Sequence, residues 1–258
     1  MAVITFTSDF GYADQYAAAV KAKILSQDMQ ATIVDVSHAI EPYNIAQAEY
    51  VLGSVFSEFP EGSVHLAAVN TLGNKLGIYH AARYKGHYFL LADNGLLSLL
   101  TDGKPEMVIE IKTDNPLMPS PVKDLLAPAA VFLAKGGNIE VLGDRTSNFR
   151  QLMNRQLRLG DHSVSGHIIH IDRYGNLITN ITRESIDTIA HGRTFTVHFA
   201  RETAVRVLKN YAQVNDGDCC CIYNSQGRLC IGVNKGRAAD VLHLGFDSQV
   251  KVRFYPGS

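Results

Sequence analysis

The feature that most constrains this chain is a change in its hydrophobic pattern after about residue 150. Before that point, short β-branched runs alternate with Ala-rich segments whose apolar residues recur at helical spacing. The runs that predict strands are residues 2–7, 31–36, 63–69 and 88–92, and the segments that predict helices are residues 16–27, 45–56 and 124–134. Strands that alternate with helices are typical of βαβ units, so residues 1–150 are expected to form an α/β domain with a largely parallel sheet.

The second half of the chain carries short strand-like runs separated by turn residues. These runs are residues 165–171, 195–199, 204–208, 219–223, 229–233 and 250–254. This spacing is typical of small barrels and sandwiches, so residues 160–258 are expected to form a smaller, all-β, barrel-like C-terminal domain. The polar and basic segment at residues 145–160 is expected to link the two domains.

The charge balance excludes several classes of partner. The chain has 24 Lys and Arg against 25 Asp and Glu, a formal net charge of -1, so no broad basic surface for nucleic acid is expected. No apolar run reaches the roughly 18–20 residues that span a bilayer, and the first residues do not resemble a signal peptide. We therefore expect a cytoplasmic protein that binds neither nucleic acid nor a membrane.

The common metal and phosphate motifs are absent from the sequence. Cys219, Cys220 and Cys221 are adjacent and Cys230 lies nine residues on, a spacing that favours small buried residues in strands over a zinc site. Neither a Gly-rich phosphate loop nor a GxSxG elbow occurs, and His38 is expected to be a hydrogen-bonded structural histidine. No metal site and no bound cofactor are predicted.

Asp9 and Asp14 are the first candidates for a binding role. Asp9 follows the first predicted strand, and ligands of parallel α/β sheets bind beyond the carboxyl ends of the strands. A carboxylate there can accept both hydroxyls of a ribose, and Asp14 can hold a ligand ammonium group. The alternative is that Asp9 is a turn residue and that Asp14 is the N-cap of the following helix.

Three further segments combine turn residues with polar side chains. In the segment DRYGN, Tyr174 offers a stacking face and Asn176 offers a donor and an acceptor for a purine edge, although a hairpin turn explains the same residues. Residues 92–97 and the turn at residues 224–227 are expected to have structural roles.

Six segments, taken in order, resemble one family. They are SDFGYADQYAAAVKAKIL, DVSHAIEPYNIAQAEYVL, FPEGSVHLAAVN, ADNGLLSLL, DLLAPAAVFLAKG and HIDRYGNLITNI. Over about residues 3–240 the chain resembles the S-adenosylmethionine (SAM) hydroxide adenosyltransferases, the SAM hydrolases related to fluorinases and chlorinases. The resemblance implies an α/β domain followed by a β-barrel, and a homotrimer whose site lies between one subunit's N-terminal domain and a neighbour's C-terminal domain.

The resemblance also implies roles for individual residues. Asp9 matches the ribose carboxylate and Asp14 a contact to the methionine amino group, while Tyr174 forms an aromatic wall and Asn176 contacts adenine. Asp172 is implied to reach the methionine end. The remaining matches are Ser225 for the methionine carboxylate, Gln226 where the halogenases carry an arginine, and Tyr43 where they carry a pocket aromatic.

The chain departs from the family where the hydrolases place their water-activating Asp-Arg-His set. The loop after the third strand reads AVNTLGNKLG, so the aspartate becomes Asn70 and the arginine falls on Lys75 or Leu76. The histidine falls on Pro121 in SPVKD. Neither Asn70 nor Pro121 can act as a general base. Thr71 and Ser120 lie near the positions of the serine and threonine of the halogenase pocket.

The leading hypothesis is an enzyme that displaces methionine from C5′ of SAM, with water or hydroxide, to give adenosine and methionine. SAM is then the substrate, and no cofactor is expected. Asn70 and Lys75 are the candidate catalytic positions, although they differ from the family's residues. Two alternatives are a non-catalytic protein that binds or senses SAM or adenosine, and a different chemistry on another nucleoside.

Overall fold

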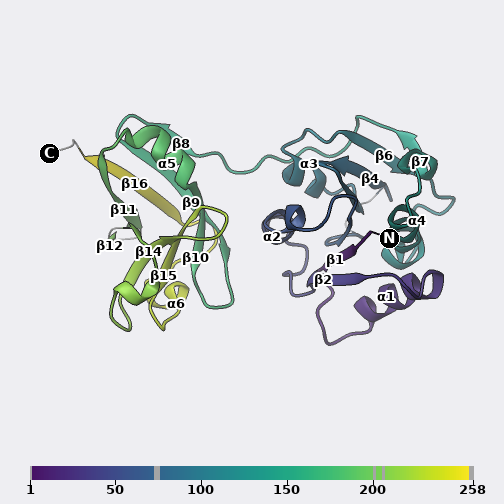
Figure 1. Ribbon diagram of the computed structural model, residues 1–258, viewed down its shortest axis with the longest axis horizontal. Coiled ribbons are helices and arrows are strands. Elements are labelled where there is room, and N and C mark those ends of the chain that lie inside the picture. Colours follow the sequence, from purple (N-terminus) through teal and green to yellow (C-terminus); the bar gives the residue numbers. More distant parts are fainter. Residues whose placement is uncertain (1, 73–75, 200–201, 205–206, 256–258) are drawn as a thin grey trace. The chain divides into compact units, whose positions relative to one another are not determined.

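The computed structural model describes residues 2–72, 76–199, 202–204 and 207–255, with residues 202–204 described by their backbone alone (Figure 1). The chain divides into two compact units, Met1–Asn154 and Arg155–Ser258. Among the described residues, no helix combines the length and apolar character that crossing a bilayer requires.

The N-terminal unit is a seven-stranded sheet in the order β2-β1-β3-β5-β4-β6-β7. The strands are β1 Ile4–Ser8, β2 Ile33–Ser37, β3 Val64–Ala68, β4 Tyr79–Tyr84, β5 His87–Ala92, β6 Met107–Ile111 and β7 Gly143–Arg145. Strands β2, β1, β3 and β5 are mutually parallel, as the alternating pattern predicts.

The other half of this sheet is antiparallel, so the expectation of a largely parallel sheet is confirmed only in part. The physical reason is the two-residue turn between β4 and β5, where Lys85 and Gly86 both have positive φ, at 48° and 76°. Positive φ at both central residues is typical of the tight turn of a hairpin, and a hairpin joins antiparallel strands. The sequence interpretation missed β4, and the sheet is mixed.

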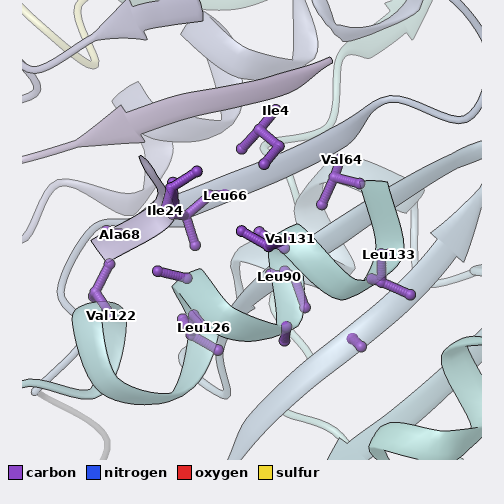
Figure 2. Close-up of a cluster of buried hydrophobic side chains, with 14 of the residues drawn as sticks. Ile4, Ile24, Val64, Leu66, Ala68, Leu90, Val122, Leu126, Val131 and Leu133 are labelled. Atoms are coloured by element: carbon purple, nitrogen blue, oxygen red, sulfur yellow. The ribbon is translucent and has the colours of Figure 1, made fainter. Parts of the chain in front are cut away.

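Helices cover both faces of this sheet. They are α1 Tyr16–Gln27, α2 Ile45–Gly53, α3 Leu96–Thr101 and α4 Ala127–Ala134, with a π-helical turn η2 Val122–Leu126 and short 3₁₀ turns η1 Phe56–Glu58 and η3 Ile139–Leu142. Figure 2 shows Ile4, Leu66 and Leu90 of the strands beside helix residues Ile24, Leu126 and Val131. Alternate residues of β5 pack on the opposite face against α2 and α3. Helices on both faces leave every residue of β1 and of β3 buried, polar residues included.

The start of α1 corrects one prediction. The N-cap of this helix is Gln15, with no side-chain capping bond, so Asp14 is not the cap. Asp14 lies exposed in the loop before the helix. At the other end of the domain, Gly136 follows α4 with φ 87°, the left-handed conformation in which helices commonly end.

The C-terminal unit is dominated by one nearly barrel-like sheet in the order β12-β11-β16-β9-β10-β15-β14-β13, with β8 paired to β9. The strands are β8 Arg158–Gly160, β9 Ser163–Ile171, β10 Leu177–Thr182, β11 Thr194–Phe199, β12 Glu202–Ala204, β13 Val207–Leu208, β14 Cys219–Tyr223, β15 Arg228–Val233 and β16 Gln249–Tyr255. Their inward side chains, among them Val164, Leu177 and Ile231, form a separate apolar core.

This unit is not entirely β. It also contains helices α5 Arg183–Ala190 and α6 Ala238–Leu242 and a 3₁₀ turn η4 Tyr211–Gln213. Helix α5 begins at a capping box in which Thr182 and Ser185 bond each other's backbone. The sequence interpretation missed these short helices. The cysteine prediction is confirmed, because Cys220, Cys221 and Cys230 are buried free thiols.

Candidate functional site

The candidate residues of the N-terminal domain share one edge of the sheet. The parallel strands β1, β2, β3 and β5 end there, and the antiparallel β4 begins there because Tyr79 lies opposite Ala92. The loops that carry Asp9, Tyr43 and Asn70 therefore meet at the carboxyl edge, where α/β sheets bind their ligands.

The Asp9 carboxylate joins three of these loops. Its Oδ2 accepts hydrogen bonds from the backbone N–H groups of Tyr43 and Asn70, each at 3.0 Å. Both donors have left-handed backbone conformations, with φ 68° at Tyr43 and φ 49° at Asn70. Non-glycine residues adopt this conformation at a cost, and such strain clusters at functional sites. Among the described residues, none donates to Oδ1.

Contacts among Ser8, His38 and Asp35 support the same loop, with Ser8 and His38 buried and Asp35 exposed. Ser8 Oγ lies 2.7 Å from His38 Nδ1, and His38 Nε2 lies 3.1 Å from Asp35 Oδ1. The His38 side chain is 1% exposed, and burial lowers its pKa against the opposing effect of Asp35. This arrangement of residue types also occurs in nucleophilic triads. Here Ser8 is fully buried, so these three side chains stabilise the loop instead of forming a nucleophilic triad. The predicted structural role of His38 is confirmed.

The loop after β5 fixes the loop after β3. Asn94 is buried, and its Nδ2 donates to the carbonyl of Val69 at 2.8 Å. Its Oδ1 accepts from the N–H of Leu96 at 3.1 Å. Gly95 has φ 96°, and a Cβ there would meet Leu152 at 2.4 Å, so the position requires glycine. The structural role predicted for residues 92–97 is confirmed.

Two hydroxyl-bearing residues lie on loops at this edge. Thr71 is 6% exposed, and its Oγ1 has no hydrogen-bond partner among the residues that the structure describes. A buried hydroxyl left unpaired costs about 1–3 kcal/mol, so it favours a polar ligand nearby. Ser120 is half-buried, and its carbonyl accepts from Asp124 at the start of η2. Figure 2 shows Val122 of that turn beside Ala68, at the carboxyl end of β3.

The remaining N-terminal candidates have varied positions. Lys75 lies outside the described residues. Tyr43 is 73% exposed, so its backbone rather than its side chain is engaged with Asp9. Pro121 is buried as the residue before η2. The described N-terminal unit therefore brings Asp9, Asn70 and the Tyr43 backbone into contact.

The C-terminal candidates Tyr174 and Asn176 lie together at one end of β10 and β15. They line a cavity of about 590 Å³ in which the Tyr174 side chain is 77% exposed. The sequence interpretation missed the rest of its lining, which comprises Arg173, Tyr211, Val233, Asn234, Lys235, Gly236 and Arg237. The segment after β15, residues 234–237, could have been predicted to form a turn, because it is polar and contains a glycine directly after a strand.

Asp172 stabilises the turn between β9 and β10, which contributes Tyr174 and Asn176 to the lining of this cavity. Its Oδ1 accepts from the backbone N–H of Asn176 at 2.9 Å, and its Oδ2 accepts from Asn176 Nδ2 at 2.8 Å. Gly175 supplies the turn with φ 82°. The hairpin-turn interpretation is confirmed, and Asp172 lies beside Asn176 rather than beside Ser225.

Ser225 and Gln226 lie at the other end of β15. They form the turn between β14 and β15, where Gln226 Nε2 donates to Ser225 Oγ at 2.7 Å and Asn224 accepts from the N–H of Gln226. Six residues of strand separate this turn from Asn234, or roughly 20 Å at about 3.3 Å per residue. One C-terminal unit therefore places the two groups of predicted contacts at opposite ends of one strand.

Tyr211, which lines the cavity, contacts the buried Cys230 thiol. Burial raises the pKa of Tyr211, whose hydroxyl lies 3.8 Å from Cys230 Sγ. Burial also raises the pKa of Cys230 to about 12, although the Tyr211 contact opposes it. Both groups are therefore neutral near pH 7.

Among the described residues, no group of three or more His, Cys, Asp and Glu side chains could hold a metal ion.

Two family models match this chain. Residues 4–143 match the SAM hydroxide adenosyltransferase N-terminal domain, and residues 166–251 match the C-terminal domain of the same family.

Similar proteins match over nearly the full length. An (R)-S-adenosyl-L-methionine hydrolase from Methanocaldococcus jannaschii is 27% identical, covering 97% of this chain and 95% of the relative. A protein of that name from Thermus thermophilus is 29% identical over 95% of this chain and 96% of its own length, and a fluorinase from Nocardia brasiliensis is 25% identical over 97% of both. The crystal structure of an uncharacterized conserved protein from Thermotoga maritima matches with a TM-score of 0.88 and 26% identity, covering 97% of this chain and all of that one.

Proposed function

Because this chain belongs to the SAM hydroxide adenosyltransferase family, we propose that it cleaves SAM at C5′ to give adenosine and methionine. The observation that carries the proposal is the Asp9 carboxylate, whose Oδ2 is held at the carboxyl edge by two loop amides of left-handed backbone conformation. Relatives named as hydrolases of this substrate match over nearly the whole chain, which supports catalysis over binding alone.

Asp9 would bind the ribose diol. Two amides on Oδ2 fix the direction of the carboxylate, so Oδ1 is oriented before the ligand arrives. Hydrogen bonds from sugar hydroxyls to a carboxylate are charge-assisted and stronger than neutral ones. The same contact would fix the ribose so that C5′ faces the loops of Asn70 and Thr71.

The rest of the ligand would lie along the C-terminal unit. Adenine would stack on Tyr174 and meet Asn176, while Ser225 and Gln226 at the far end of β15 would bind the methionine carboxylate. Asp14 would hold the methionine amino group from the N-terminal domain. An extended ligand parallel to β15 explains why the predicted contacts lie at its two ends.

The chemical step is an in-line displacement. The oxygen of water or hydroxide bonds to C5′, the C5′–S bond breaks, and its electron pair neutralises the sulfonium to give the thioether of methionine; one proton leaves when water attacks. The sulfonium is a good leaving group, so the protein has to position the ligand and exclude bulk water. Asn70 and Pro121 supply no base, and the unpaired Thr71 hydroxyl would accept a hydrogen bond from the nucleophile. The proposal requires no cofactor.

The assembly is proposed from the family resemblance as a homotrimer in the cytoplasm, with each site shared between subunits. A mixing experiment tests this arrangement. Asp9→Ala damages the part of a shared site that the N-terminal unit supplies, and Asn176→Ala damages the part that the C-terminal unit supplies. When the two variants are refolded together, some sites will combine an intact N-terminal unit from one variant with an intact C-terminal unit from the other, and these sites should be active. A mixture that stays as inactive as each variant alone would contradict the shared site.

Turnover is tested with SAM in water enriched in ¹⁸O. Adenosine and methionine should form in equal amounts, with ¹⁸O in the 5′-hydroxyl of adenosine. The Asp9→Ala protein, prepared identically, controls for contaminating enzymes that release adenosine from SAM, and Asp114→Asn controls for the loss of one exposed carboxylate. Absence of adenosine at high enzyme concentration with any nucleophile, while calorimetry detects SAM binding, would replace the proposal with the non-catalytic alternative.

A further inference from the structure

We infer that Asp35 is a positioning residue for the loop that carries Asp9, and that it acts by setting the tautomer of the His38 ring. The inference rests on the proposed function, because it concerns how the ribose-binding carboxylate is held in place. It gives a role in ligand binding to a residue of the edge strand β2 that is not among the predicted site residues.

An irregularity in the pairing of β1 with β2 allows Asp35 and His38 to meet. In a regular strand, residues three positions apart point to opposite faces of the sheet. Here the register shifts after Phe6, which pairs with Asp35, and Val36 is left without a partner on β1. An extra residue of this kind forms a β-bulge, which re-aims the side chains around it. Asp35 Oδ1 and His38 Nε2 lie 3.1 Å apart as a result.

The contact with Asp35 determines which nitrogen of His38 carries the proton. An ionised carboxylate only accepts hydrogen bonds, so Nε2 has to be the protonated nitrogen of the neutral ring. Nδ1 is then an acceptor, and it takes the hydroxyl proton of Ser8, whose Oγ lies 2.7 Å away. Burial lowers the pKa of His38 in spite of Asp35, so the ring is neutral near pH 7.

Asp35 itself is ionised under the same conditions. Desolvation alone would raise its pKa, but the contacts with Lys21 and His38 outweigh this effect, and the pKa lies below its ordinary value. Lys21 of α1 binds Oδ2, which leaves Oδ1 for the ring. Each carboxylate oxygen therefore has its own donor.

The Ser8 hydroxyl transmits the tautomer to the loop. Because Ser8 donates its proton to His38, its oxygen accepts the N–H of Phe10, the residue after Asp9, at 3.3 Å. With the proton on Nδ1 instead, the Ser8 oxygen would accept from both the ring and Phe10, and its own proton would need another acceptor at a fully buried position. One ring thus fixes the residues on both sides of Asp9.

The backbone of His38 also holds this loop, in a way that the tautomer does not affect. Its carbonyl accepts from the N–H of Gly11 at 2.8 Å, and its N–H donates to the hydroxyl of Tyr12 at 3.3 Å. A substitution of Asp35 keeps these contacts and changes only what the ring can donate or accept. It therefore isolates the contribution of the tautomer.

Nitrogen-15 NMR of the imidazole rings, combined with SAM calorimetry on the full chain, tests the inference. At pH 7 the wild-type His38 ring, assigned by the signals that His38→Asn loses, should carry its proton on Nε2. In Asp35→Asn the ammonium of Lys21 only donates and keeps the amide oxygen, so the amide NH₂ faces Nε2 and the ring proton moves to Nδ1. SAM affinity should then fall at least about fivefold, which corresponds to one unsatisfied buried hydroxyl.

Two further variants separate positioning from general stability. Asp144→Asn removes an ion-paired carboxylate from β7, at the opposite edge of the same sheet, and should change neither the His38 tautomer nor the affinity. Ser8→Ala removes the hydroxyl that links the ring to the loop, and adding Asp35→Asn to it should cause no further loss of affinity. Additive losses in the double variant would show that Asp35 acts by another route.

The remaining outcomes distinguish this inference from the proposed function. A wild-type ring with its proton on Nδ1 overturns the inference, and so does a proton shift in Asp35→Asn with unchanged SAM affinity. If the wild type shows the expected tautomer but binds no SAM, the proposed function fails and the inference fails with it. Should Asp35→Asn not fold by circular dichroism, wild-type SAM affinity in Ser8→Ala alone contradicts the inference.

Discussion

Two carboxylates organise the two halves of this protein in different ways. Asp9 bonds the backbone of residues 34 and 61 positions away, whereas Asp172 bonds a residue four positions away. The contacts of Asp9 therefore form only when strands β1, β2 and β3 are assembled in the sheet. The contacts of Asp172 with Asn176 form within five consecutive residues. Damage to the first should spread through several loops, and damage to the second should stay local.

Removal of the Asp9 carboxylate should have the largest effect. Asp9→Ala removes the proposed ribose contacts, each worth roughly 1.5–3 kcal/mol, and also leaves the Tyr43 and Asn70 N–H groups without their acceptor. We expect SAM affinity to fall at least about 100-fold by calorimetry.

The matched comparison for this variant is Asp9→Asn. Its amide can still accept from the two backbone donors through its carbonyl oxygen while the negative charge is lost. Affinity between those of the wild type and Asp9→Ala would support both roles of the carboxylate. Wild-type affinity in Asp9→Ala would refute the ribose role.

A methyl group in the Asp172 hairpin tests the local side of the comparison. In Gly175→Ala the new Cβ would lie 2.7 Å from Cβ of Arg237, at a residue with φ 82°. The left-handed conformation costs roughly 1–2 kcal/mol and the overpacking about 1–3 kcal/mol. Urea unfolding should show a loss of about 2–5 kcal/mol in the C-terminal transition. Gly192→Ala, at φ 81° with open space around it, carries the conformational cost without the clash and should lose less.

Acid should weaken the N-terminal domain through His65. This residue is fully buried, with Nδ1 2.7 Å from Thr5 Oγ1 and Nε2 3.2 Å from His87 Nδ1. Burial, with a smaller effect of His87, lowers its pKa to about 3, whereas the unfolded chain titrates near 6.5. Below pH 6.5 the unfolded state binds a proton that the folded state does not, so stability is lost as the pH falls.

The expected loss from His65 alone is about 2 kcal/mol in the free energy of unfolding between pH 7 and pH 5. Urea unfolding of the wild type and of His65→Gln at the two pH values measures it as the difference between their losses. The exposed His191→Gln serves as the control. Equal losses in the wild type and in His65→Gln would show that His65 is not responsible.

The smallest effect is expected at His38, behind the Asp9 loop. His38→Asn removes the contacts to Ser8 and Asp35, at a cost of about 1 kcal/mol in unfolding free energy. If the contacts among Ser8, His38 and Asp35 position the loop that carries Asp9, SAM affinity should also fall several-fold, although His38 is not proposed to touch the ligand. Unchanged affinity with reduced stability would restrict His38 to the core.

Much of the fold was predictable because the relevant signals are local. Apolar runs such as residues 63–69 and 219–223 predicted strands that the structure confirms. The tight turn at Lys85 and Gly86 was missed because its positive φ values are not encoded in strong turn residues at both positions. That turn makes β4 and β5 antiparallel, and it is why a sheet expected to be largely parallel is mixed.

The candidate site divides in the same way. Tyr174 and Asn176 were found from turn chemistry in one short segment, and they do share a cavity. Tyr211 and Arg237 were missed because they join that cavity from distant parts of the chain. The links from Asp9 to Tyr43 and Asn70 were equally invisible, since backbone donors carry no residue signature.

By itself, the sequence determined that this chain has an α/β half and a β half and that Asp9 stands at the end of the first strand, because hydrophobic period and chain order are local properties. Only the tertiary structure decided what Asp9 and Asp172 touch. Hydrogen-bond partners depend on which loops the strand order brings to one edge, and side-chain distance in space is not a function of distance along the chain. For that reason the structure shows Asp9 bound to two remote loops and Asp172 bound to Asn176.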